Sequence, residues 1–157
     1  MRKLALLAIL ILSMIAIVSN QKFYGQQGQL LPLSKRINLF ENNLEANHKP
    51  YKMIGENKCN PNGKIVQKIT TNQSFEIVAL PLIEATDSAY YPRDFAGALY
   101  ASNGYKLSEA TSKYGIRLKT KLPEENQEKK THKFEFTNPN ENPVKVRFYI
   151  VQVDPIN

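Results

Sequence analysis

The strongest pattern in the sequence is an alternation of apolar and polar side chains across residues 144–150. The even-numbered positions are all apolar, whereas the odd-numbered positions carry Lys145, Arg147 and Tyr149. Successive side chains of a β-strand point to opposite faces, so a period of two predicts a strand with one face buried and the other in water. An Asn- and Pro-rich turn at residues 138–143 precedes it. We therefore expect the chain to end in a half-buried antiparallel sheet.

Shorter segments of the same kind predict further strands. We expect them at residues 51–54, 65–71, 74–80, 116–122 and 134–136. Residues 71–73 are expected to close a tight hairpin, and residues 81–104, the least regular part, are expected to form a long loop. Five to seven short strands without βαβ alternation predict a mainly β fold, an antiparallel β-sandwich of jelly-roll or immunoglobulin-like type. A small open barrel is the alternative.

One short N-terminal helix is expected before the strands, across residues 34–46. Ile37, Phe40 and Leu44 recur at the spacing of one helical face, and Ser34 is suited to the N-cap position. The helix would present one apolar face to a neighbouring surface.

Residues 1–20 have the parts of an export signal. Arg2 and Lys3 form a positive start, residues 4–18 are uncharged and apolar, and polar residues follow from Ser19. The apolar run is shorter than the roughly 20 residues of a full membrane span, which favours a cleaved signal. Asn20 makes a poor cleavage site, so a retained anchor stays open. We expect an extracytoplasmic protein that is secreted, periplasmic or membrane-anchored, touching the membrane only through residues 1–20 if these are kept.

The rest of the chain has room for one domain. Residues 21–29 are rich in Gln and Gly and are expected to form a flexible spacer, followed by a single β-rich domain over residues 30–157. Cys59 is the only cysteine, so the domain cannot close an internal disulfide and must be held together by packing. No second ligand lies at metal-binding spacing, and we expect no metal and no cofactor.

Catalytic templates are absent from the sequence. It contains no nucleophile elbow, phosphate loop or zinc-protease motif, and no catalytic residue is assigned. His48 and His132 are both expected to be solvated loop residues. Acidic residues at 84, 87, 94 and 109 offer the one route to hydrolysis, since a glycosidase needs two facing carboxyls. We expect Glu84, Asp87, Asp94 and Glu109 to be turn or capping residues instead.

Residues 90–94 form the most suggestive binding feature. Tyr90 and Tyr91 stand beside Arg93 and Asp94, and Tyr and Arg are the residues that most often dominate binding interfaces. These rings could stack on a sugar or a peptide. Adjacent tyrosines also commonly occupy a strand end with one ring buried.

A second candidate is a basic face. Arg117, Lys119 and Lys121 follow a spacing of two, with Lys113 nearby, and the whole chain has a net charge of +7. On a strand these residues would form a positive stripe able to meet an anionic partner. A solvated edge protected by lysines is the simpler interpretation. Nucleic acid is not expected as a partner of an exported chain.

Three functions are compatible with these features. The first is an exported, non-enzymatic binding or structural protein that contacts a protein or glycan partner through residues 81–104. The second is a small envelope polysaccharide hydrolase with paired carboxylates. The third is a subunit of a larger envelope assembly, in which the helix at residues 34–46 docks on a neighbour. The oligomeric state is left open.

Overall fold

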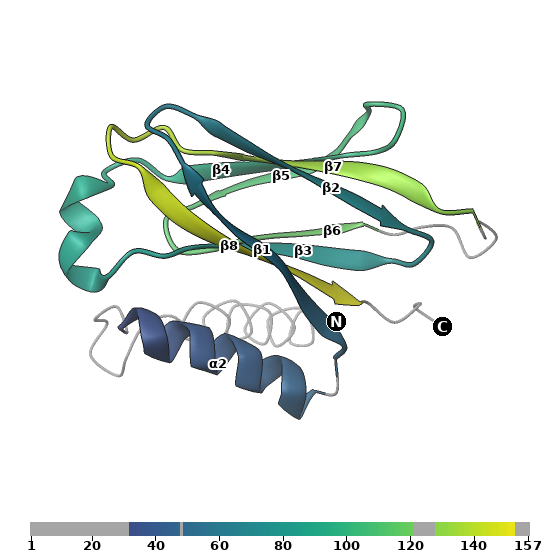
Figure 1. Cartoon of the computed structure of the whole chain (residues 1–157), viewed down its shortest axis with the longest axis horizontal. Coiled ribbons are helices and arrows are strands. Elements are labelled where there is room, and N and C mark those ends of the chain that lie inside the picture. The colour runs from purple at the N-terminus through teal and green to yellow at the C-terminus, as the bar shows by residue number, and fades with distance from the viewer. Residues whose placement is uncertain (1–31, 48, 121–127, 153–157) are drawn as a thin grey trace, which may run out of the picture.

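The computed structural model of the chain describes residues 32–47, 49–120 and 128–152. The expected leader and spacer lie outside these residues. Within them, eight strands form two four-stranded antiparallel sheets, in the orders β1-β8-β3-β6 and β2-β7-β4-β5. Figure 1 shows the two sheets as stacked layers, with helix α2 lying along the outer side of the first sheet. The strands are β1 Tyr51–Cys59, β2 Lys64–Thr71, β3 Phe75–Pro81, β4 Phe95–Tyr100, β5 Lys106–Ser112, β6 Ile116–Thr120, β7 Lys130–Thr137 and β8 Val144–Gln152.

The strand pairs are nested along the sequence. β1 pairs with β8, β2 with β7, β3 with β6, and β4 with β5, each antiparallel. Nested pairs that alternate between two sheets are what a long hairpin produces when it rolls up, which is the jelly-roll arrangement. The predicted β-sandwich is confirmed in this form. Two separate sheets exclude the alternative of a small open barrel.

The main core lies between the two sheets. Its aromatic centre includes Phe95 stacked on Phe136, with ring centroids 5.4 Å apart, and Phe148 edge-on to Phe136 at 6.3 Å. β4 approaches the other sheet closely at Gly97, where an added Cβ would lie 2.6 Å from Ile116 Cγ2. Only glycine fits at this point, because any side chain would force the core apart. Cys59 is fully part of this core, and burial raises the pKa of its thiol.

Helix α2, Leu33–Ala46, confirms the expected helix but begins differently. Pro32 precedes its first turn, so Ser34 is not the N-cap. The Leu33 backbone N–H instead donates to Glu84 Oε2 at 3.1 Å, from a segment 51 residues further along the chain. A carboxylate at this end of a helix satisfies a free N–H and complements the helix dipole. The cap is therefore supplied by tertiary structure.

The helix covers the outer face of the β1-β8-β3-β6 sheet (Figure 1). Its buried residues Phe40 and Leu44 form a second apolar cluster with outward-facing side chains of β3 and β8, namely Val78, Leu80, Tyr149 and Val151. As a result every residue of β3 is buried. The predicted half-buried pattern of residues 74–80 is wrong for this reason, and so is the prediction that Tyr149 faces water.

Three local predictions also differ from the structure. β1 extends from Tyr51 to Cys59, five residues beyond the expected short strand. The hairpin predicted at residues 71–73 is wrong, because β2 and β3 belong to different sheets and residues 72–74 carry the chain from one sheet to the other. Residues 81–104 contain a 3₁₀ helix, Ala85–Tyr90, and strand β4. β4 and β5 escaped prediction because their small and hydroxylated side chains carry little hydrophobic alternation.

Candidate functional site

The predicted binding segment, residues 90–94, is tied to the turn at residues 138–143. The Tyr91 hydroxyl donates to the Pro143 carbonyl at 2.8 Å, and its half-buried ring packs 5.9 Å from Phe95. Burial raises the pKa of Tyr91. Tyr91 is thus a structural residue at the rim of the core, which removes it from the proposed pair of binding rings.

Arg93 also joins residues 90–94 to the turn at residues 138–143. Its backbone N–H donates to Asn140 Oδ1 at 2.9 Å, and Asn140 Nδ2 donates back to its carbonyl at 3.0 Å. Asn140 is itself buried and hydrogen-bonded to Asn138. These reciprocal hydrogen bonds hold the two loops, residues 90–94 and 138–143, together. Of the four predicted residues, Tyr90 (61 % exposed), Arg93 and Asp94 keep exposed side chains, and the Arg93 guanidinium donates to the Pro139 carbonyl at 3.4 Å.

The predicted basic stripe is partly used in contacts within the protein. Arg117 and Lys119 lie on the outer face of edge strand β6, as expected. Arg117 makes a two-pronged ion pair with buried Glu76, with distances of 3.0 and 2.9 Å, and lies 5.8 Å from the centre of the Phe40 ring of α2. Lys113 is in the turn before β6, and Lys121 lies outside the described residues. Because Arg117 is committed to Glu76 and the helix, the stripe does not form a continuous positive surface.

The predicted carboxylates have separate roles. Glu84 caps α2, Asp87 accepts a hydrogen bond from the Thr86 hydroxyl at 3.4 Å, and Glu109 pairs with Lys106 at 2.6 Å. Glu84 directly precedes the 3₁₀ helix, Asp87 lies within it, and Glu109 is on edge strand β5. Among the described residues no group of three or more ligating side chains could hold a metal ion.

His132 is the clearest error among the expected loop residues. It lies inside the sandwich on β7, 2 % exposed, with its ring edge-on to Phe75 at 5.3 Å. Its Nδ1 atom is buried without a hydrogen-bond partner, and burial lowers the pKa of the imidazole. Neighbouring lysines in sequence suggested a solvated histidine, but Lys133 alternates to the other face of the strand and His132 itself points inward. His48 lies outside the described residues.

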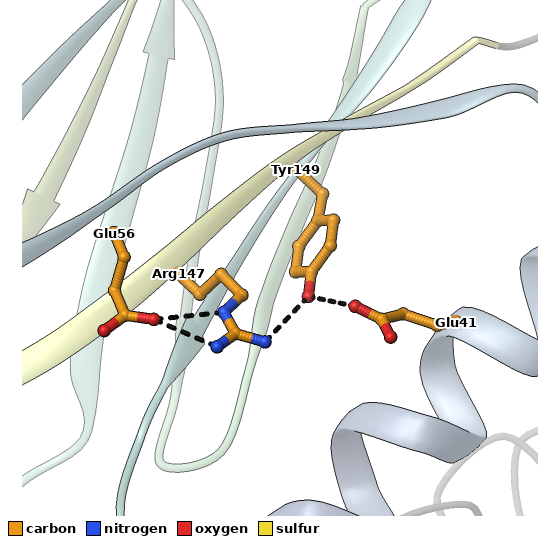
Figure 2. Close-up of polar contacts among 4 residues, drawn as sticks. All are labelled: Glu41, Glu56, Arg147 and Tyr149. Atoms are coloured by element: carbon orange, nitrogen blue, oxygen red, sulfur yellow. Dashed lines mark hydrogen bonds and ion pairs between the residues drawn. The ribbon is translucent and has the colours of Figure 1, made fainter.

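A polar chain connects α2 to the far edge of its sheet. Figure 2 shows Glu41 of the helix, then Tyr149 and Arg147 of β8, then Glu56 of β1. The Tyr149 hydroxyl donates to Glu41 at 2.7 Å, and Arg147 binds Glu56 through two nitrogens at 3.2 and 3.0 Å. Burial, with the hydrogen bond to Glu41 second, raises the pKa of Tyr149 to about 12. This series of hydrogen bonds has a structural role, because its donors and acceptors bond to one another within the protein.

The outer face of the second sheet holds a groove that sequence reasoning missed. It has a volume of about 380 Å³, and small side chains, Ala96 and Ala98 of β4, form its floor. Glu135 of β7 and Glu109 of β5 stand opposite each other across Ala98, since both are its register partners. The other side chains that line the groove are Lys64, Tyr100, Ala110, Thr111 and Thr137.

Ion pairs fix the charged walls of this groove. Glu135 is bound by Lys133 at 3.0 Å and by Lys64 at 3.6 Å, and the Lys133 contact is the main reason that its pKa is lowered. The Lys133 ammonium also lies 4.6 Å from the centre of the Tyr100 ring. The signal that could have located this site is the run of small residues at 96–98, which leaves room above a strand.

Comparisons with known proteins add a likeness to solved structures. No family model matches the chain, and no curated protein sequence is similar to it. The crystal structure of Yersinia pseudotuberculosis-derived mitogen (YPM) aligns with a TM-score of 0.47 and 7 % identity, over 69 % of this chain and 91 % of that chain. At this distance the function of the chain has to be argued from its own residues. Within the described part of the chain, no helix has the length and apolarity needed to span a membrane.

Proposed function

We propose that this chain is an exported, non-enzymatic binding protein of the cell envelope or extracellular space that holds a glycan in the groove over β4. The export part of the proposal rests on the signal-like residues 1–20. The observation that carries the glycan is the groove itself, with its alanine floor and its polar walls.

The floor suits a flat, polar ring. Ala96 and Ala98 put only methyl groups between the taller side chains of β7 and β5, so a sugar ring can lie against the sheet. Tyr100 adds an aromatic side chain at one end, held by Lys133. Aromatic rings and small apolar patches bind the C–H faces of polar ligands without needing a large buried area.

The walls suit hydroxyl groups. The carboxylates of Glu109 and Glu135 can accept hydrogen bonds from sugar hydroxyls, and the Lys64 ammonium can donate them. Hydroxyls of Thr111 and Thr137 add groups that do both. A protein partner would instead need a wider interface of roughly 800 Å² on each side, with an apolar centre. The groove offers a narrow polar site, which favours the glycan.

The hydrolase alternative is weaker at the same place. Glu109 and Glu135 are separated by two strand spacings, about 9.6 Å between backbones, which a water-using glycosidase could span. A general acid, however, needs a carboxyl with a raised pKa, whereas the pKa of Glu135 is lowered by Lys133. The lowered pKa disfavours Glu135 as that acid, which supports binding over cleavage in this groove.

The structure gives less support to the alternative of a subunit that docks on a larger assembly through α2. The apolar side of α2 is packed on the protein's own sheet, so this helix does not offer a free docking face.

The test is a glycan array probed with protein purified from cells that express the full chain. We expect retention of a restricted set of oligosaccharides, and we expect Ala98→Trp to weaken that binding at least tenfold by filling the groove. Lys119→Trp places the same ring on the exposed edge of the other sheet and should bind like the wild type. Thermal unfolding of each variant checks that the fold is kept.

Two results would count against the proposal. Absence of retained glycans, or unchanged binding by Ala98→Trp, would remove the groove as the site. Release of reducing ends from a bound polysaccharide by wild type but not by Glu109→Gln would replace binding with hydrolysis.

A further inference from the structure

A second hollow lies where the edges of the two sheets meet. It opens between β1 and β2, at the end where residues 71–74 pass from one sheet to the other, and has a volume of about 340 Å³. Sites for small molecules begin at about 300 Å³. This cleft is separate from the groove over β4, because it enters the sandwich from its edge rather than lying on an outer face.

Apolar side chains from both sheets line the interior of the cleft, beside Gln67 and Thr71 on the inner face of β2. Ile54, Phe75 and Ile150 belong to the first sheet, and Ile69 belongs to the second. Ile69 and Phe75 are buried, whereas Ile54 and Ile150 pack against the core yet stay partly exposed. Covering exposed aliphatic surface inside a cleft with an apolar ligand removes that surface from water, which favours binding.

The mouth of the cleft is cationic. Its ionisable lining residues are Lys52 and Lys68, and it has no acidic lining residue. Lys52 is the register partner of Ile150, so its side chain leaves the strand on the same side as that apolar residue. Within the described ranges neither lysine makes an ion pair. Gln152 and Gln73, hydrogen-bonded to each other, complete a polar rim.

We propose that this cleft binds a single-chain amphiphile with an anionic head group, such as a fatty acid. The apolar chain lies on Ile54, Ile69, Phe75 and Ile150, and the carboxylate meets the Lys52 ammonium at the mouth. Charge complementarity selects this ligand, since the groove over β4 contains two carboxylates and the cleft contains none. The inference is independent of glycan binding.

The experiment is titration calorimetry of the purified protein with sodium decanoate, below the concentration at which it forms micelles, and with decan-1-ol. We expect saturable binding of one decanoate. Lys52 would supply the charge-assisted hydrogen bond to the carboxylate, so Lys52→Gln should weaken decanoate binding by about tenfold and leave decan-1-ol binding unchanged. Lys58→Gln, on the outward face of the same strand, is the matched control and should bind decanoate like the wild type.

A second variant tests the apolar interior. Gln67→Phe narrows the cleft from the β2 side and should weaken decanoate and decan-1-ol alike. Ala98→Trp, in the other groove, should leave decanoate binding intact. The proposal is overturned if the wild type shows no saturable decanoate binding, or if Lys58→Gln loses as much affinity as Lys52→Gln.

Discussion

The outer face of the β1-β8-β3-β6 sheet lies beneath α2, whereas the outer face of the β2-β7-β4-β5 sheet is open to solvent (Figure 1). Both faces are built from alternating strands of similar length. Val78, on central strand β3 of the covered face, is 0 % exposed, and Val66, which faces outward on edge strand β2 of the open face, is 49 % exposed. One helix has turned the first face into a second core and left the other face available for binding.

This comparison explains where binding features can lie. Arg117 and Tyr149, which a strand pattern assigns to water, are used in holding α2 to its sheet. None of the described helices covers the polar and small residues of β4, β5 and β7, and the groove forms among them. Matched substitutions on the two faces test this difference.

The largest expected effect comes from the helix itself. Leu44 of α2 is 2 % exposed against the sheet, so Leu44→Ala removes buried methyl groups and should lower the free energy of unfolding by about 3 kcal/mol. Leu39→Ala, on the exposed side of the same helix, should change it by less than about 0.5 kcal/mol. Urea denaturation measures both. Equal effects would mean that α2 does not cover the sheet in solution.

The second comparison uses one substitution on both faces. Val78→Ala should lower the free energy of unfolding by about 2 kcal/mol, because it uncovers buried surface beneath the helix. Val66→Ala, on the open face, should stay within about 0.5 kcal/mol of the wild type. Denaturant midpoints of the two variants give the difference directly. A costly Val66→Ala would show that the second face is covered as well.

A smaller effect is expected from the polar tie drawn in Figure 2. Tyr149→Phe keeps the ring beneath α2 and removes only the hydroxyl that donates to Glu41. The loss should be about 1 kcal/mol, the usual contribution of one such bond. Asn42→Ala, at the exposed position next to Glu41, is the control. If Tyr149→Phe unfolds at the wild-type denaturant concentration, the tie adds nothing to the packing of the ring.

The smallest expected effect is a pH dependence that separates the inner and outer sides of β7. His132 faces the core and its pKa is lowered there, so the unfolded chain binds its proton more readily. Its contribution to stability is therefore complete above the unfolded value of about 6.5 and is lost as the pH falls from there toward the lower folded value. Glu135, on the outer side, affects stability only at lower pH, because the stability that comes from its lowered pKa is lost below about 4.5.

Unfolding free energies measured between pH 7.5 and pH 5 test this prediction. We expect the wild type to lose stability over that interval and His132→Phe, which keeps a ring against Phe75, to lose less. A Lys133→Gln variant, which alters the outer face of the same strand, should follow the wild-type curve in this range. An identical slope for His132→Phe would assign the dependence to other groups.

Local patterns were sufficient for much of the fold. The alternation at residues 144–150 located β8, the spacing of Phe40 and Leu44 located α2, and the absence of βαβ units predicted the sandwich. These features depend on neighbours within one element, and the physical cause is the fixed direction of successive side chains. The weakly patterned strands β4 and β5, by contrast, are held by pairing with β7 and with each other.

The candidate sites depended on contacts that no local pattern contains. Tyr91 and Arg93 looked like binding residues until the turn at residues 138–143, about 50 positions away, took up their hydrogen bonds. The groove requires residues of β2, β4, β5 and β7 to lie in register, and the cleft requires β1 and β2 to meet at the sheet edges.

The residue pattern alone predicts a β-rich chain with one amphipathic helix, a signal-like start and no internal disulfide. The period of side chains along each element is enough for those conclusions. Tertiary structure alone decided which sheet face α2 covers, and therefore which polar side chains stay accessible. The reason is that burial of an outward-facing side chain depends on a surface supplied from a distant part of the chain, here residues 33–46 lying on β3 and β8.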